Sequence, residues 1–251
     1  MNNFASFLYQ YRESNGLSRE DVANIINSKF HRISGVDSAS ISMWERNASL
    51  PEMKKMSQVI SALETKKSVL DILKKFKLPN DTRLRNAIDR IIIRKLGCIP
   101  FRNEYLPIYW FNDEGEGRYV ETLKDIGHDH SSNKASELEV IRLSLNNIDT
   151  GIIIYSRIKD DLYIHYINYM DINALRYCLT KLCDLLEYSS CGYLLAHNLD
   201  QTMTDIMMLI RGSLTQRKVV MDKFFVISRI AMILNELDSG LSSSTQGKAL
   251  S

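Results

Sequence analysis

Apolar residues recur at helical spacing from the start of the chain. Phe4, Phe7 and Leu8 share one helical face, and the Asn15-Gly16 pair that follows them is typical of a helix end. Similar spacing continues in the next segments, without the strict alternation that is typical of strands. The first third of the chain is therefore predicted to fold as short helices.

Polar residues mark the starts of the second and third of these helices. Ser18 is placed to cap the second helix, and Asp37 is placed to cap a third over residues 38–46. Ile41 and Trp44 stand three positions apart in the third helix, which is the spacing of a buried stripe. We therefore expect these two side chains to face the core and their neighbours to face outward.

The helical pattern breaks once and resumes before residue 100. A fourth helix is predicted after Pro51, and the break falls at Leu78-Pro79-Asn80. Asp81 then begins a helix whose apolar stripe is flanked by arginines. This helix either connects two domains or pairs two chains, and its stripe is too short to indicate a coiled coil.

After Gly97 the pattern changes to extended segments that are rich in aromatic and β-branched residues. Helical spacing returns only after residue 170. The predicted elements are, in order, two extended segments within 99–123, strands at 138–145, 151–158 and 161–170, and helices over 172–188, 200–210 and 217–237. Strands followed by helices indicate an α+β domain.

The formal net charge of +2 conceals an asymmetry along the chain. Residues 1–100 contain 17 Lys and Arg against 10 Asp and Glu, whereas the remainder contains 15 against 20. A basic amino-terminal part suits a module that contacts phosphate, and an acidic remainder suits one that does not. The alternative interpretation is an uneven but solvated surface.

The cysteines and the apolar runs bear on the compartment. The chain has four cysteines and no CxxC pair, so we expect reduced, mostly buried thiols in a cytoplasmic protein. The first residues lack the basic start and apolar run of a signal peptide. No apolar run approaches the roughly 18 residues of a membrane span, so no membrane contact is expected.

Two stretches, FLYQYRESNGLSREDVA and GVDSASISMWERNASLP, occur in this order within residues 4–64. Together they resemble the Cro/CI type (XRE family) of helix-turn-helix transcription regulators. Arg12 falls at the family's helix-one arginine, Ala23 at its small inward position, and Trp44 with Glu45 in its recognition-helix signature. The resemblance implies sequence-specific binding to double-stranded DNA, and a structural pair of Arg12 and Glu45 that ties the first helix to the third.

By this resemblance the third helix enters the major groove, where its outward residues read base edges. Arg19 matches a position that grips phosphate, and Arg46 and Asn47 lie where the DNA backbone passes the end of the helix. The residues expected at the DNA are Arg19, Lys29, Arg32, Ser38, Ala39, Ser40, Met43, Arg46 and Asn47.

The sequence departs from the family's pattern in two places. NSKFHRIS, residues 27–34, is inserted where the family has a tight turn, and its Lys29 and Arg32 could add phosphate contacts. Asn47 stands where the family has glycine. Asparagine tolerates the left-handed backbone conformation better than most residues, so the helix end can survive this change.

We therefore expect an all-α helix-turn-helix domain followed by an α+β domain. The whole is interpreted as a transcription regulator, such as a repressor, that acts as a homodimer. The expected units are the DNA-binding domain at 1–78, a linker helix at 79–97, the α+β domain at 98–238 and a disordered tail at 239–251.

The sequence leaves the role of the α+β domain open between sensing a small ligand and dimerising. Alternatives are a phage-type repressor with a ligand-independent oligomerisation domain, and a fusion to an acetyltransferase-like enzyme domain. A helix-turn-helix that binds protein instead of DNA is a third interpretation. No convincing Ser-Lys set for self-cleavage is present, nor a Walker, GxGxxG or GxSxG motif, so we expect no enzymatic activity and no cofactor.

Aromatic residues of the α+β domain could line a ligand pocket, although they are also common strand formers. The candidates for such a pocket are Tyr109, Trp110, Tyr155, Tyr163 and Tyr166. His128-Asp129-His130 is interpreted as a solvated loop, and the cysteines lack the spacing of a metal site, so no metal is expected.

Overall fold

The computed structural model describes part of the chain. The described residues are 3–30, 35–76, 78, 81–97, 139–145, 148–158, 161–188, 192–197, 201–211 and 218–246. The predictions that lie outside them concern the extended segments within 99–123, the His128 to His130 loop, Arg32, Tyr109 and Trp110.

The amino-terminal region is helical, as the apolar spacing predicts. Its helices are α1 (Phe4–Ser14), α2 (Arg19–Lys29), α3 (Ser38–Glu45), α4 (Met53–Leu63) and α5 (Val69–Leu73). Polar caps fix several starts: the Ser18 and Asp21 side chains form a capping box at α2, and Asp37 accepts a hydrogen bond from the backbone N–H of Ser40 at α3. Each cap satisfies helix-start N–H groups that have no partner within the helix.

A long helix, α6 (Thr82–Gly97), follows and packs against the last helix, α10 (Lys223–Gln246). Two ion pairs hold the start of α6 in place. Arg85 Nη2 lies 2.8 Å from the buried carboxylate of Glu236, and Asp81 Oδ2 lies 3.0 Å from Arg229 Nη1.

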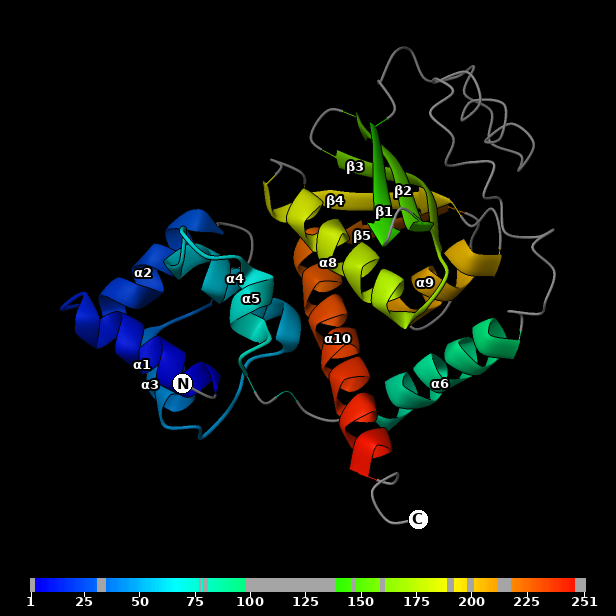
Figure 1. Cartoon of the computed structure of the whole chain (residues 1–251). Coiled ribbons are helices and arrows are strands. Elements are labelled where there is room, and N and C mark those ends of the chain that lie inside the picture. Colours follow the sequence, from blue (N-terminus) through cyan, green and yellow to red (C-terminus); the bar gives the residue numbers. More distant parts are fainter. Residues whose placement is uncertain are drawn as a thin grey trace.

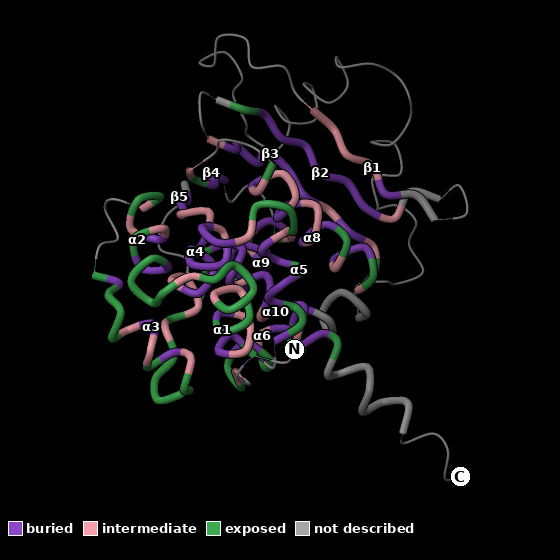
Figure 2. Tube along the Cα trace, turned by 90° about the vertical axis from the view of Figure 1, so that its left-hand side faces the viewer, coloured by how far each residue is buried: buried purple, intermediate pink, exposed green. Residues whose placement is uncertain are grey.

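The second region is built on one mixed sheet. Its strands are β1 (Glu139–Leu145), β2 (Ile148–Ile158), β3 (Asp161–Tyr169), β4 (Tyr193–His197) and β5 (Lys218–Asp222), and their spatial order follows the chain. All neighbours are antiparallel except β3 and β4, which are parallel and are joined through α8 (Ile172–Tyr188). Strands β2 and β3 are buried along nearly their whole described length (Figure 2).

Two strands of this sheet were not predicted. Residues 193–197 form β4, and residues 218–222, which were expected to begin a helix, form β5. Strands and helices thus alternate after β3, with α9 (Gln201–Arg211) between β4 and β5. The prediction of strands first and helices afterwards is wrong for this part, because five-residue apolar runs beside helical ones carry no distinguishing period. Helix α10 also extends to Gln246, beyond the expected start of the tail.

Helix α10 lies at the centre of the molecule, between the α1–α5 group and α6 (Figure 1). It packs against α4 through a buried pair of hydroxyls, Ser57 and Ser228, whose oxygens are 2.7 Å apart. At its start the ring of Phe224 meets Phe30 edge-on, with centroids 5.3 Å apart. The helical region and the sheet region therefore share one continuous apolar core.

Candidate nucleic-acid interface

Helix α3 is anchored by its apolar side, as the spacing of Ile41 and Trp44 predicts. Ile41 is fully buried, and Trp44 packs edge-on against Phe4 of α1 with ring centroids 6.0 Å apart. Val22 and Ala23 bring α2 into the same core. Burial of this stripe fixes which side of α3 is left for solvent.

The opposite side of α3 is exposed, and it carries most of the residues that were expected at DNA. Ser38, Ala39 and Met43 are exposed, and so are Arg46 and Asn47 at the end of the helix. Ser38, Ala39 and Ser42 stand at i, i+1 and i+4, so they line one side together.

Ser40 and Asn47 have local structural roles. The Ser40 hydroxyl donates to Asp37 Oδ1 at 2.6 Å, and this bond with that from the Ser40 backbone N–H lowers the pKa of the Asp37 carboxyl. Asn47 adopts a φ of 55°, which is the left-handed conformation expected of a residue that stands where the resembled family has glycine. The Ser40 hydroxyl therefore takes part in the cap at the start of α3, and Asn47 provides the left-handed residue that ends the helix.

Glu45 joins three helices at one buried carboxylate. Its Oε1 accepts from Arg12 Nε of α1 at 2.6 Å, and its Oε2 accepts from Arg19 Nε of α2 at 2.8 Å. The Glu45 side chain is 3% exposed, Arg12 is 13% exposed and Arg19 is 44% exposed. The hydrogen bond to Glu45 is the largest cause that raises the pKa of Arg12. The sequence suggested the Arg12 contact but gave no sign that Arg19 shares the same carboxylate.

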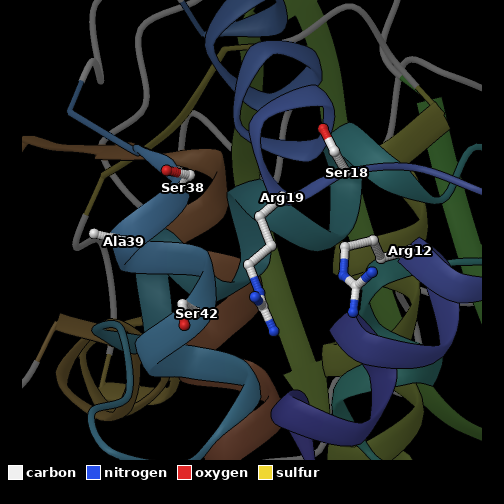
Figure 3. Close-up of a pocket in the computed structure, with 6 residues that line it drawn as sticks. All are labelled: Arg12, Ser18, Arg19, Ser38, Ala39 and Ser42. Atoms are coloured by element: carbon white, nitrogen blue, oxygen red, sulfur yellow. The ribbon is translucent and has the colours of Figure 1, made fainter.

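An open hollow of about 530 Å³ lies between the start of α2 and α3 (Figure 3). Arg19 extends across it from α2, and Arg12 stands on the side of α1. Its lining residues are Arg12, Ser18, Arg19, Ser38, Ala39 and Ser42. Ser42 was not among the residues expected at DNA, although its i+4 relation to Ser38 could have indicated it.

Lys29 lies away from this hollow. Its Nζ donates to the carbonyl oxygen of Ala62 at 2.7 Å, and this bond joins the end of α2 to the end of α4. A lysine in this position satisfies a carbonyl group that has no partner within its own helix. The Lys29 ammonium group, which was expected to contact a DNA phosphate, is thus hydrogen-bonded within the protein.

The positive charge of residues 1–100 is not spread evenly. Residues 1–50 contain five basic and five acidic residues, whereas residues 51–100 contain 12 basic and five acidic ones. Part of this second group borders another hollow, of about 290 Å³, between the α4–α5 connection and the start of α10. Lys66, Lys67 and Lys223 line it together with Glu187.

The tyrosines proposed for a ligand pocket are buried in the sheet. Tyr155 donates from its hydroxyl to Glu139 at 2.7 Å, and burial together with this bond raises the pKa of Tyr155 to about 12. Burial also raises the pKa of Tyr163 to about 12, and its ring lies beside His165. Tyr166 is buried as well. None of the three lines either of the hollows above.

Other groups with reactive chemistry are enclosed. The thiols of Cys178 and Cys183 are buried, and burial raises the pKa of Cys178 to about 12. Among the described residues, no group of His, Cys, Asp and Glu side chains is arranged to hold a metal ion. Within the same residues, no helix combines the length and the apolar character that crossing a membrane requires.

No protein-family model, curated protein or solved structure matches this chain. The residues and geometry of α1 to α3 therefore provide the basis for a functional interpretation of this chain.

Proposed function

We propose that the chain is a sequence-specific DNA-binding transcription regulator whose α2 and α3 form a helix-turn-helix of the Cro/CI type. The observation that carries this proposal is the two-sided character of α3. Ile41 and Trp44 anchor one side in the core, and the other side exposes small and flexible residues, among them Ser38, Ala39 and Met43. Small side chains let a helix approach the floor of the major groove closely.

The start of α2 supplies the phosphate contact in this proposal. Arg19 is 44% exposed and is held by Glu45 at the edge of the α2–α3 hollow. A guanidinium that is fixed through one nitrogen retains other N–H groups for a phosphate oxygen. Arg46 and Asn47, exposed at the end of α3, are placed for a second contact with the DNA backbone.

The sheet region, in this proposal, supplies dimerisation or ligand sensing for the DNA-binding helices. Its coupling to them is direct, because α10 packs against α4 and Phe224 meets Phe30 at the end of α2. A shift of α10 would therefore displace α2 through direct side-chain packing.

Selection from a pool of randomised duplexes, read by sequencing, tests the proposal. A dimeric regulator is expected to enrich a two-fold-related motif whose half-sites are centred about 34 Å apart, one turn of the duplex. A pool that remains random after repeated rounds would contradict sequence-specific binding.

A second candidate is a helix-turn-helix that binds another protein. The equal numbers of acidic and basic residues in 1–50 favour it, because DNA-binding surfaces are usually basic. This candidate predicts that mixed-sequence duplexes bind weakly and without the salt dependence that released counterions produce. A titration at several salt concentrations distinguishes the two candidates.

A further inference from the structure

The hollow of about 290 Å³ lies where three segments of the chain meet. One wall is the α4–α5 connection, residues 64–68, the second is the end of α8, and the third is the start of α10. Its volume is close to the lower end of the range for pockets that hold small organic ligands. The hollow is therefore large enough for a small metabolite, and it shares no lining residue with the α2–α3 hollow.

Three lysines supply the positive charge of this lining. Lys66 and Lys67 come from the α4–α5 connection and are exposed, and Lys223 is the first residue of α10. No ion pair among the described residues includes any of the three. Ammonium groups from two separate segments thus border one hollow without a carboxylate partner in the described part of the chain.

The carboxylates near these lysines are engaged in other contacts. Glu64 Oε1 accepts from the backbone N–H of Lys66 at 2.9 Å. The two oxygens of Glu187 accept hydrogen bonds at the start of α5, from Ser68, Val69 and Leu70. Asp222 caps α10 and lies 3.5 Å from Lys54. Even when both glutamates of the lining are counted against its three lysines, one positive charge remains in excess.

The other polar and aromatic groups of the lining suit an organic phosphate. Ser61 and Thr65 add hydroxyl groups, and the ring of Tyr188, at the end of α8, is 87% exposed. Lysines bind phosphate as point charges, and hydroxyl groups donate hydrogen bonds to its oxygens. Three ammonium groups attract a doubly charged phosphate more strongly than a singly charged carboxylate. An exposed aromatic ring beside them can cover the uncharged part of the ligand.

We propose that this hollow binds a small ligand that carries a phosphate monoester. Lys66, Lys67 and Lys223 surround the phosphate group, and the rest of the ligand lies against Tyr188. A sugar phosphate and a mononucleotide both have this chemistry. Because the lysines belong to separate walls, the bound phosphate links the α4–α5 connection to the start of α10.

Both of these walls contact the end of α2. Phe224 of the lining meets Phe30 edge-on, and Lys29 of α2 donates to the carbonyl of Ala62, which is next to Ser61 of the lining. A ligand that shifts either wall therefore displaces α2. The inference rests on the proposed function in this step alone, which predicts that the ligand alters the affinity for DNA and that DNA alters the affinity for the ligand by the same factor.

Isothermal titration calorimetry of the full chain, in a phosphate-free buffer of low salt concentration, tests the ligand site. The probes are ribose phosphate and adenosine monophosphate, and adenosine serves as the probe that lacks a phosphate. Both phosphate esters are expected to bind, whereas adenosine is not. The tighter of the two esters identifies the source of the phosphate, and either order supports the inference.

Substitution of the lysines locates the bound ester. The double variant Lys66→Gln/Lys67→Gln is expected to raise the dissociation constant of both esters by about tenfold, and Lys223→Gln by about threefold or more. The matched control is Lys74→Gln/Lys75→Gln, an adjacent pair of exposed lysines just after α5 that does not line the hollow. This control is expected to stay within about twofold of the parent. Far-UV circular dichroism checks that each variant is folded.

Failure of both esters to bind overturns the inference. So does equal binding of adenosine and adenosine monophosphate, or an unchanged dissociation constant in both lysine variants. Fluorescence anisotropy on an enriched duplex, with and without the ester, measures the coupling to α2. We expect the affinity for DNA to change by about fivefold or more, and an unchanged affinity refutes the coupling. A chain that binds the esters but enriches no duplex motif contradicts the proposed function and leaves the ligand site standing.

Discussion

Removal of the Glu45 carboxylate by Glu45→Ala is expected to destabilise the contact of α1, α2 and α3. The substitution leaves Arg12, which is 13% exposed, without its 2.6 Å partner. Breaking a buried ion pair by removing one partner costs about 3–5 kcal/mol. Arg12 retains Glu13 at 2.7 Å and the carbonyl of Leu17 at 3.4 Å, which lowers that cost. The more exposed contact with Arg19 adds less than about 1 kcal/mol.

We therefore expect Glu45→Ala to lower the free energy of unfolding by about 2–3 kcal/mol. For a chain of this size the melting temperature should fall by about 4–12 °C. Urea unfolding followed by tryptophan fluorescence measures the loss, because Trp44 is buried against α1 beside this contact.

Glu13→Ala is the matched control for this experiment. Glu13 contacts the same arginine at a similar distance, but its side chain is 51% exposed. An exposed pair contributes little, so the control is expected to stay within about 0.5 kcal/mol of the parent. Equal unfolding midpoints for Glu45→Ala, Glu13→Ala and the parent would refute the structural role of the Glu45 contact.

Two further predictions concern Glu187 and Arg19. Burial raises the pKa of the Glu187 carboxyl above 4.5, although this carboxyl accepts hydrogen bonds from Ser68, Val69 and Leu70. Because the folded state holds the proton more tightly than the unfolded state does, the contribution of Glu187 to stability is largest at low pH. That contribution declines as the pH rises through the raised pKa. Urea unfolding from about pH 4 to 7 should show the stability of the parent relative to Glu187→Gln falling with pH, and a rising difference would contradict the stated effect of burial. Arg19→Ala should weaken binding to all duplexes and lower the slope of the logarithm of the binding constant against the logarithm of salt concentration by about one. The control is Arg90→Ala, which removes an exposed arginine of α6 and should change neither quantity. Equal slopes for Arg19→Ala and the parent in fluorescence anisotropy titrations would remove Arg19 from the interface.

Local signals explain what the sequence predicted correctly. Apolar spacing together with the caps at Ser18 and Asp37 located α1 to α3, because both signals lie within a few residues of the helix they define. Long alternating or apolar runs likewise located β1 to β3. The apolar stripe of Ile41 and Trp44 was sufficient to orient α3.

The features that the sequence did not reveal depend on contacts between distant residues. Lys29 reaches Ala62, and Arg19 reaches Glu45, through a fold that brings separate helices together. Strand β5 is too short to show a period that distinguishes it from the helix that follows it, and its pairing with β4 was not visible in the local sequence. The direct packing of α4 on α10 has the same origin, since no local pattern at Ser57 or Ser228 indicates their contact.

The base preference of α3 is the most direct test of the central claim. The selection on randomised duplexes is repeated with Met43→Ala, and with Met208→Ala as the matched control. Both methionines are similarly exposed, at 40% and 46%, but Met208 lies on α9. We predict that Met43→Ala alters the preferred base at specific positions of the enriched motif, whereas Met208→Ala enriches the parent motif. An unchanged motif with Met43→Ala, or no enriched motif with the parent chain, would contradict DNA reading by α3.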